Sequence, residues 1–313
     1  MNIGQKMQAL YSRFVDIDEV KIELHKELLA INIRNRAAEA TIFLQGAQLS
    51  QYQPHKERPV IWLSPDCDYK VGSPLRGGIP VCWPWFGGLD KNPESIQQQA
   101  SSSVKQAHGF VRALEWDIDF VKAISLDETE LQMSLTLDAN DLWPFACKLV
   151  LKFTIGAQLT LCFEVQNNDS KAFVFTSALH SYFSIGDITQ TKISGLDGKS
   201  FIDALHDWQI FTQQGDITID REIDRIYESN GEVIQIVDSQ WQRQISILSK
   251  SSAHAVVWNP WVDKSKRLSQ FSDSGFKQLL CVESANIGRD GVALQPGERH
   301  IQVLEVMSQS LPS

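Results

Sequence analysis

The sequence has few of the patterns that indicate a metal, nucleotide or redox site. Its five cysteines are odd in number and contain no C-x-x-C pair, so neither a complete disulfide framework nor a typical zinc or redox centre is indicated. The seven histidines include no H-E-x-x-H or H-x-H pair. No G-x-G-x-x-G follows a strand pattern, and no G-x-S-x-G occurs. We therefore expect no cofactor and no metal.

Long apolar runs and an excess of positive charge are missing as well. Residues 1–20 carry charged side chains such as Lys6, Arg13 and Asp16 and lack the apolar core of a secretory signal. No apolar run approaches the length of a membrane span. A formal net charge of -9 argues against nucleic acid, because binding a phosphate backbone needs a basic face. We expect a cytoplasmic protein with free thiols and neither a nucleic-acid nor a membrane partner.

The sequence is rich in alternation of apolar and polar residues, the pattern of half-buried β-strands. Two alternating runs in residues 148–165 are joined by Gly156-Ala157-Gln158 and predict a hairpin. Residues 234–237 and 244–248 predict a second hairpin. Strands at this spacing predict an all-β fold, a large and mainly antiparallel β-sandwich. Further alternating runs, the last of which we expect to close the sheet system, are 20–24, 30–35, 132–137 and 301–306.

Signals for helices and domain boundaries are sparse. Residues 5–14 could form a short helix within an N-terminal extension of residues 1–20. The chain shows no βαβ rhythm, no internal repeat and no Pro/Gly/Ser-rich linker. A length of 313 residues is compatible with two domains, but all-β folds of about 200–250 residues often form one. We predict that residues 1–313 form a single domain.

Two glycine-containing segments carry side chains that suit a sugar or an anion. In residues 74–87, Arg76 precedes two glycines and several aromatics. A guanidinium suits an anionic group and aromatics suit a sugar face, but a connecting loop with a solvated arginine has the same composition. In residues 107–112, His108 and Arg112 flank a glycine and would share a face if the segment were a strand. Such a pair can equally be structural.

Three further residues stand out for their surroundings. His180 follows the strand-like residues 173–176, where a histidine is often an ordinary rim residue. Asp224 belongs to a charged stretch that also fits a solvated surface. Glu283 directly follows an apolar run, so we expect it at a strand end or paired, because burying it alone is costly. Partial desolvation would raise its pKa toward the range useful for proton transfer.

In this order, these segments resemble motifs of the hexose-6-phosphate mutarotase (glucose-6-phosphate 1-epimerase) family. That family belongs to the wider galactose mutarotase-like, aldose 1-epimerase superfamily. The resemblance extends from about Ile22 to Val306. The matching blocks are RGGIP at 76–80, HGFVR (family HGFAR) at 108–112, LHSYF (family LHTYF) at 179–183, DRIY (family DRVY) at 224–227, VWNPW at 257–261 and CVE at 281–283.

The resemblance implies a β-supersandwich with a sugar cleft on a concave sheet face. By the family pattern, His180 is the catalytic histidine and Glu283 the catalytic carboxylate. Substrate-binding positions of the family are matched by Arg76, Arg112 and Asp224, and His108 lies in the same motif as Arg112.

One position departs from the family pattern. The family commonly has Gln directly before the HGFAR histidine, whereas this chain has Ala107 there and Gln106 one residue earlier. A one-residue shift turns a strand side chain to the other face, so Gln106 is not carried over as a substrate contact.

Anomer exchange requires the sugar ring to open and close again. We assign Glu283 as the base that takes the anomeric hydroxyl proton and His180 as the acid that protonates the ring oxygen. We expect Glu283 to be ionised at neutral pH and His180 to titrate nearby, each transfer contributing roughly 10²–10⁴-fold. Arg76, with Arg112, would bind a 6-phosphate, and Asp224 would accept hydrogen bonds from hydroxyls. The expected partner is thus a small-molecule sugar phosphate, and we expect a monomer.

Other functions fit parts of the same pattern. A non-catalytic carbohydrate-binding sandwich would bind sugar without accelerating anomer exchange. An aldose 1-epimerase for unphosphorylated sugar would not need the arginines. A glycosidase needs two carboxylates flanking the scissile bond, which Asp224 and Glu283 could formally supply. A member with a regulatory role would keep the site but serve a partner protein.

Overall fold

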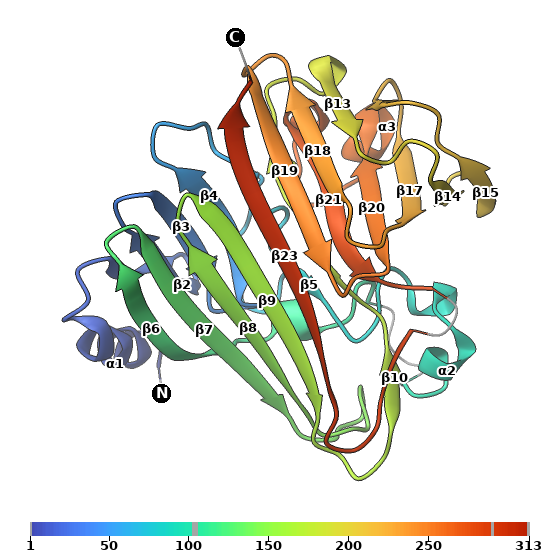
Figure 1. The fold of residues 1–313 in the computed structure, drawn as a ribbon. Helices are drawn as coiled ribbons and strands as arrows, with labels where there is room; N and C mark the ends of the chain where they lie inside the picture. Colours follow the sequence, from blue (N-terminus) through green and yellow to red (C-terminus); the bar gives the residue numbers. More distant parts are fainter. Residues whose placement is uncertain (1, 102–105, 289–290, 312–313) are drawn as a thin grey trace.

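The computed structural model describes residues 2–101, 106–288 and 291–311. Over these ranges strands dominate and helices are short (Figure 1). The paired strands run antiparallel, which confirms the predicted all-β, mainly antiparallel fold. No helix in this described part of the chain is long and apolar enough to cross a membrane.

The largest sheet has nine strands in the order β16-β13-β18-β19-β23-β9-β8-β7-β6. Both predicted hairpins, β8–β9 and β18–β19, form within it. The final alternating run lies in β23, which pairs with β19 and β9 and so joins the two hairpins. The strands are β6 (Asp117–Ser125), β7 (Glu128–Leu137), β8 (Cys147–Ile155), β9 (Gln158–Asn167), β13 (Thr191–Ser194), β16 (Ile217–Thr218), β18 (Val233–Asp238), β19 (Arg243–Lys250) and β23 (Arg299–Ser310).

The second sheet has the order β15-β14-β17-β20-β21-β11-β5, and β12 also pairs with β21. It carries the residues of interest for function. Its strands are β5 (Val81–Cys82), β11 (Ser177–Leu179), β12 (Tyr182–Ser184), β14 (Ser200–Asp203), β15 (Gln209–Thr212), β17 (Ile223–Glu228), β20 (His254–Asn259) and β21 (Leu279–Asn286).

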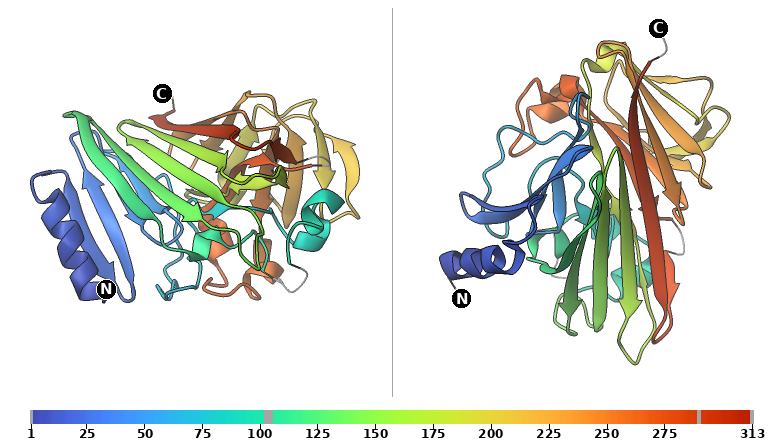
Figure 2. Two further views of the ribbon diagram at one scale, coloured as in Figure 1. Left: turned by 90° about the horizontal axis from the view of Figure 1, so that it is seen from below. Right: turned by 60° about the vertical axis from the view of Figure 1, so that its left-hand side comes forward.

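A four-stranded meander and several short elements complete the described structure. The predicted N-terminal helix forms as α1, which packs beside β1 (Figure 2). The meander has β1 (Val20–His25), β2 (Leu28–Arg34), β3 (Ala38–Phe43) and β4 (Gln48–Pro54), and β10 (Phe173–Phe175) pairs with β22 (Val292–Leu294). The helices are α1 (Ile3–Phe14), α2 (Glu94–Gln97), α3 (Trp261–Ser265) and the 3₁₀ turns η1 (Leu89–Lys91), η2 (Val111–Ala113), η3 (Ile188–Gln190) and η4 (Gly275–Gln278).

The core lies between the sheets and follows the alternation of the sequence. In β8, Leu149, Leu151 and Phe153 are buried while the residues between them are partly exposed. Ile31 of the meander and Val282 of β21 belong to the same apolar cluster, so this core contacts all three larger sheets. Each fully buried side chain of this size contributes about 1.5–3 kcal/mol.

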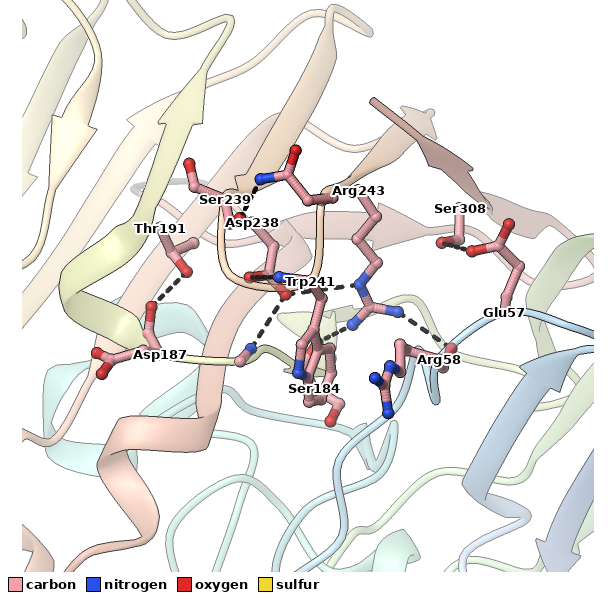
Figure 3. A network of polar contacts seen from close by, with 12 residues as sticks. Glu57, Arg58, Ser184, Asp187, Thr191, Asp238, Ser239, Trp241, Arg243 and Ser308 are labelled. Atoms are coloured by element: carbon pink, nitrogen blue, oxygen red, sulfur yellow. Dashed lines mark hydrogen bonds and ion pairs between the residues drawn. The ribbon is translucent and has the colours of Figure 1, made fainter. Parts of the chain in front are cut away.

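A buried ion pair within the nine-stranded sheet is hydrogen-bonded to the second sheet through Ser184 (Figure 3). Arg243 is 1% exposed, and its Nε lies 3.6 Å from Oδ2 of the fully buried Asp238. The guanidinium also donates to the carbonyls of Arg58 and Ser184 and stacks over Trp241. Burial lowers the pKa of Arg243 to about 10, which still leaves it charged at neutral pH. Because Ser184 ends β12, the pair holds this strand in place.

We expect Arg243→Met to lower the free energy of unfolding by about 3–5 kcal/mol, because it leaves the Asp238 carboxylate buried without its cation. Urea denaturation measures the change. Arg299→Met is the matched control, since Arg299 forms an exposed ion pair with Glu164 at 3.7 Å and should cost less than about 1 kcal/mol. Equal losses in the two variants would contradict a special role for the buried pair.

Candidate active site

A cavity of about 660 Å³ opens on the second sheet, within the size range of small-molecule sites. Its wall is built from segments far apart in the sequence, including β12, β17, β21 and the loops before β5 and η2. Five of the six residues singled out from the sequence meet here. They are Arg76, His108, His180, Asp224 and Glu283.

Glu283 lies in the middle of β21, whose eight residues are all buried. Its side chain is 2% exposed, and Val256 of β20 is its neighbour across the ladder. We expected Glu283 to lie either at a strand end or beside a partner. The first of these expectations is wrong. The buried strand continues past Glu283 because β21 is flanked by β20 on one side and by β11 and β12 on the other.

His180 stands directly across from Glu283 because of strand register. Leu179, at the end of β11, pairs with Ser284, and Tyr182, at the start of β12, pairs with Cys281. Both pairings follow one register, and its continuation sets His180 opposite Glu283. Side chains at opposite positions of neighbouring strands are in contact range. Nδ1 of His180 lies 3.3 Å from Oε1 of Glu283, although the two atoms are not aligned as a hydrogen bond.

Aromatic rings fix the orientation of His180. Its imidazole stacks on Tyr182 with ring centres 4.7 Å apart, and the Trp258 ring meets it edge-on at 6.2 Å. The exposed fraction of His180 is 7%, so little of the ring faces solvent. Both aromatic partners also line the cavity.

Burial works against charge on both members of this pair. It raises the pKa of Glu283 well above the usual range, and the nearby Asp224 adds to this effect. It lowers the pKa of His180 well below the usual range, with His108 and Arg112 acting in the same direction. Oε2 of Glu283 also has no hydrogen-bond donor among the described residues, so these surroundings favour the neutral carboxyl over the carboxylate. At this separation the two groups titrate as a coupled pair.

Arg76 reaches the cavity from a loop that is held against the meander. The N–H of Gly78 donates to the carbonyl of Trp62, and the N–H of Ile79 donates to that of Leu49. Gly78 has φ 72°, and a Cβ there would lie 2.4 Å from the Leu49 carbonyl oxygen, so this approach requires glycine. The guanidinium of Arg76 is half-buried, and its Nε donates to the Ser269 carbonyl at 3.4 Å.

His108 lies in a turn, not in the strand that would have placed it on one face with Arg112. Its φ is 63°, and a Cβ on the following Gly109 would lie 1.8 Å from the Trp83 carbonyl oxygen. The N–H of Gly87 donates to Nδ1 of His108 at 3.3 Å, so the ring proton belongs on Nε2. Burial, aided by Arg112 and Arg76, lowers the pKa of His108 to about 3, so the ring is a neutral hydrogen-bond donor.

Arg112 is the residue that does not line the main cavity. It lies in η2 and, with Arg76, borders an adjoining cavity of about 200 Å³. Its Nη2 donates to the Ala107 carbonyl at 2.8 Å. Gln106 borders the small cavity, as Arg76 and Arg112 do, and it does not border the main one. Tyr182 and Arg76 border both cavities.

Asp224 occupies β17 on the far wall of the cavity. It is half-buried, and burial raises its pKa to about 6 while the cation of Lys264 opposes the shift. Lys264 of α3 also lines the cavity and forms an ion pair with Glu222 at 3.0 Å. The carboxyl of Asp224 can therefore both accept and donate hydrogen bonds near neutral pH.

Several lining residues were missed from the sequence. Lys264, Trp258, Phe86 and Trp208 all line the cavity. Trp258 could have been selected from the VWNPW block, and Phe86 from the aromatics after Arg76. No comparable signal marked Lys264. In the described residues, no group of three His, Cys, Asp or Glu side chains is placed to hold a metal ion.

We expect Glu283→Gln to gain stability relative to wild type as the pH rises. A carboxyl whose pKa is raised by folding stabilises the native state below its unfolded pKa of about 4.3, and that contribution is lost as the pH rises through the folded pKa. Glutamine avoids this loss. The difference in unfolding free energy should grow by about 1–3 kcal/mol between about pH 5 and about pH 8, measured by urea denaturation. The exposed Glu39→Gln is the control, and a difference that does not change with pH would refute the burial effect.

The sequence matches the model of the aldose 1-epimerase family over residues 30–306. A Salmonella typhimurium protein provisionally named glucose-6-phosphate 1-epimerase is 33% identical, over 82% of this chain and 83% of that protein. An Escherichia coli K12 protein with the same provisional name is 33% identical over 83% of each chain. A Cenchrus ciliaris protein, also so named, is 30% identical over 92% of this chain and 86% of its own.

Solved structures agree with this assignment. A provisionally assigned mutarotase from Salmonella typhimurium superposes with a TM-score of 0.84 at 27% identity, covering 96% of this chain and 99% of that one. Galactose 1-epimerase from Lactobacillus acidophilus has a TM-score of 0.68 at 13% identity, over 94% of this chain and 98% of its own, a likeness of fold alone. The resemblance seen in the sequence is thereby confirmed, and the chain belongs to the aldose 1-epimerase family.

Proposed function

We propose that the protein interconverts the α and β anomers of a hexose 6-phosphate, with glucose 6-phosphate as the first candidate. The observation that carries the proposal is the contact between His180 and Glu283, 3.3 Å apart in the wall of a cavity that also contains Arg76. Membership of the aldose 1-epimerase family supports anomer exchange. The provisional names of the relatives support glucose 6-phosphate as substrate.

The reaction needs one base and one acid at neighbouring oxygens of the sugar. Glu283, as carboxylate, takes the proton of the anomeric hydroxyl while protonated His180 gives its proton to the ring oxygen, and the C1–O5 bond breaks. Rotation about C1–C2 presents the other face of the aldehyde, and the same transfers in reverse close the ring. Burial raises the pKa of Glu283, which makes its carboxylate a stronger base for this transfer.

Arg76 and Arg112 together form the proposed binding site for the phosphate. Arg76 borders both cavities, and Arg112 borders only the small one, so a phosphate placed between them would leave the sugar ring in the main cavity. Charge-assisted hydrogen bonds from two guanidiniums suit a phosphate well. A phosphate-blind epimerase would have no use for this pair, and the arrangement therefore favours a phosphorylated sugar over a free one.

His108 and Asp224 would hold the hydroxyls of the sugar. Neutral His108 offers its Nε2–H as a donor, since Nδ1 already accepts from Gly87. The carboxyl of Asp224 lies on β17 of the same sheet and would accept hydrogen bonds from the sugar. Because both groups act on hydroxyls, their loss should affect substrate choice more than proton transfer.

A cytoplasmic location and a monomeric state belong to the same proposal. The five cysteines are unpaired thiols, four of them buried, which supports a reducing compartment. The expected substrate, a phosphorylated hexose, is a small molecule, so the proposal needs no macromolecular partner.

We expect His180→Ala and Glu283→Gln each to reduce the enzymatic exchange rate by at least about 10²-fold, because each removes one proton-transfer group. NMR exchange spectroscopy on glucose 6-phosphate measures the rate between anomers. Glu39→Gln, a surface change, should exchange at the wild-type rate. If either cavity variant is folded by circular dichroism and exchanges anomers at the wild-type rate, its residue is not a proton-transfer group.

We expect Arg76→Ala to lower kcat/KM for glucose 6-phosphate by about 10- to 100-fold, the value of a lost charge-assisted hydrogen bond. The same variant should alter exchange of free glucose far less. Arg267→Ala removes an exposed arginine that borders neither cavity and serves as the control. An equal loss of activity toward both sugars would contradict a phosphate-binding role for Arg76.

A further inference from the structure

The turn between β14 and β15 contains a residue that its backbone does not favour. The N–H of Gln209 donates to the carbonyl of His206 at 3.0 Å, and the two residues between them, Asp207 and Trp208, have φ values of 51° and 59°. Two consecutive left-handed residues define a type I′ hairpin turn, for which Asn or Asp followed by Gly is preferred. Asp207 fits this preference. Trp208 stands where glycine would be expected.

The fold covers only part of this side chain, since Trp208 is 47% exposed. In the part of the chain that the structure describes, its indole makes no ring contact and donates no side-chain hydrogen bond. A large, half-exposed side chain in a left-handed conformation is an observation that points to function. Trp208 lines the cavity together with Ala204.

The turn is held firmly beside the site. The buried Asp203 accepts the N–H of Leu205 at 2.9 Å, and its Oδ2 lies 3.0 Å from Nδ1 of His206. The N–H of Ala204 donates to the carbonyl of Asp224 at 2.9 Å, so the turn is tied to the strand that carries the cavity carboxylate. β15 forms the outer edge of the sheet and projects beside β14 (Figure 1). The position of Trp208 is therefore set by the scaffold.

We infer that Trp208 stacks on the apolar C–H face of the bound hexose and so contributes to its binding in the cavity. This inference rests on the proposed function, because it takes the ligand to be a sugar. A pyranose has one flat C–H-rich face, and a flat indole covers such a face while leaving the hydroxyls free. Ile202 and Ile226, which pair across β14 and β17, add apolar surface to the wall of the same cavity.

Substitutions at Trp208 separate this binding role from a structural one. Trp208→Ala and Trp208→Gly should each raise KM for glucose 6-phosphate by about 10-fold while kcat stays within about twofold, because only contact area with the sugar is lost. Trp208→Phe, which keeps a ring, should retain most of the affinity. Trp208→Gly should in addition keep or raise Tm, because glycine suits the left-handed turn. A tryptophan needed for packing would instead lower Tm when removed.

Ile210→Ala provides the control, since Ile210 is 70% exposed on β15 and does not line the cavity. Calorimetric titration with glucose 6-phosphate gives Kd independently of turnover. A wild-type protein that binds the sugar without accelerating exchange would refute the proposed function, and a higher Kd in Trp208→Ala would still support stacking. Unchanged KM and Kd in Trp208→Ala and Trp208→Gly would overturn the inference, as would an equal loss in Ile210→Ala.

Discussion

The candidate site depends on the burial of one carboxyl group in the middle of a fully buried strand. Every residue of β21 is buried, and a lone charge at such a position costs several kcal/mol. The structure meets this cost with a histidine at the opposing position of the same ladder. Because register determines which residues face each other, the geometry of the pair is a property of the sheet backbone. Side-chain flexibility has little influence on it.

Holding that register requires support from outside the strand. β12 begins at Tyr182, two residues after His180, and it is fixed at both ends. Tyr182 donates its N–H to the carbonyl of Gly78, in the loop that also carries Arg76. Ser184 donates its N–H to Val60, and its carbonyl accepts from the buried Arg243. The ion pair shown in Figure 3 thus contributes to the site without lying in it.

The sequence predicts those parts of the structure that follow local rules. Alternation identified β8, β9, β18 and β19 because one face of each strand is buried and the other is not. The same rule misjudged Glu283, since β21 is buried on both faces and offers no alternation to mark its end. The turn at His108 escaped prediction because it depends on the approach of Gly109 to Trp83, 26 positions earlier in the chain. Family motifs identified the cavity residues, but no motif includes Trp208.

The proton transfers proposed for His180 and Glu283 return both groups to their starting states. In the proposed reaction, the carboxyl gives back at ring closure the proton it took at ring opening, and the imidazole recovers the one it gave. Each turnover therefore leaves the protein in its starting protonation state, with no net exchange of protons with bulk water. The two directions of the reaction use the same groups in the same states. His180 is 7% exposed and Glu283 is 2% exposed. Such a buried pair can act repeatedly because it does not need to take up or release a proton to solvent between turnovers.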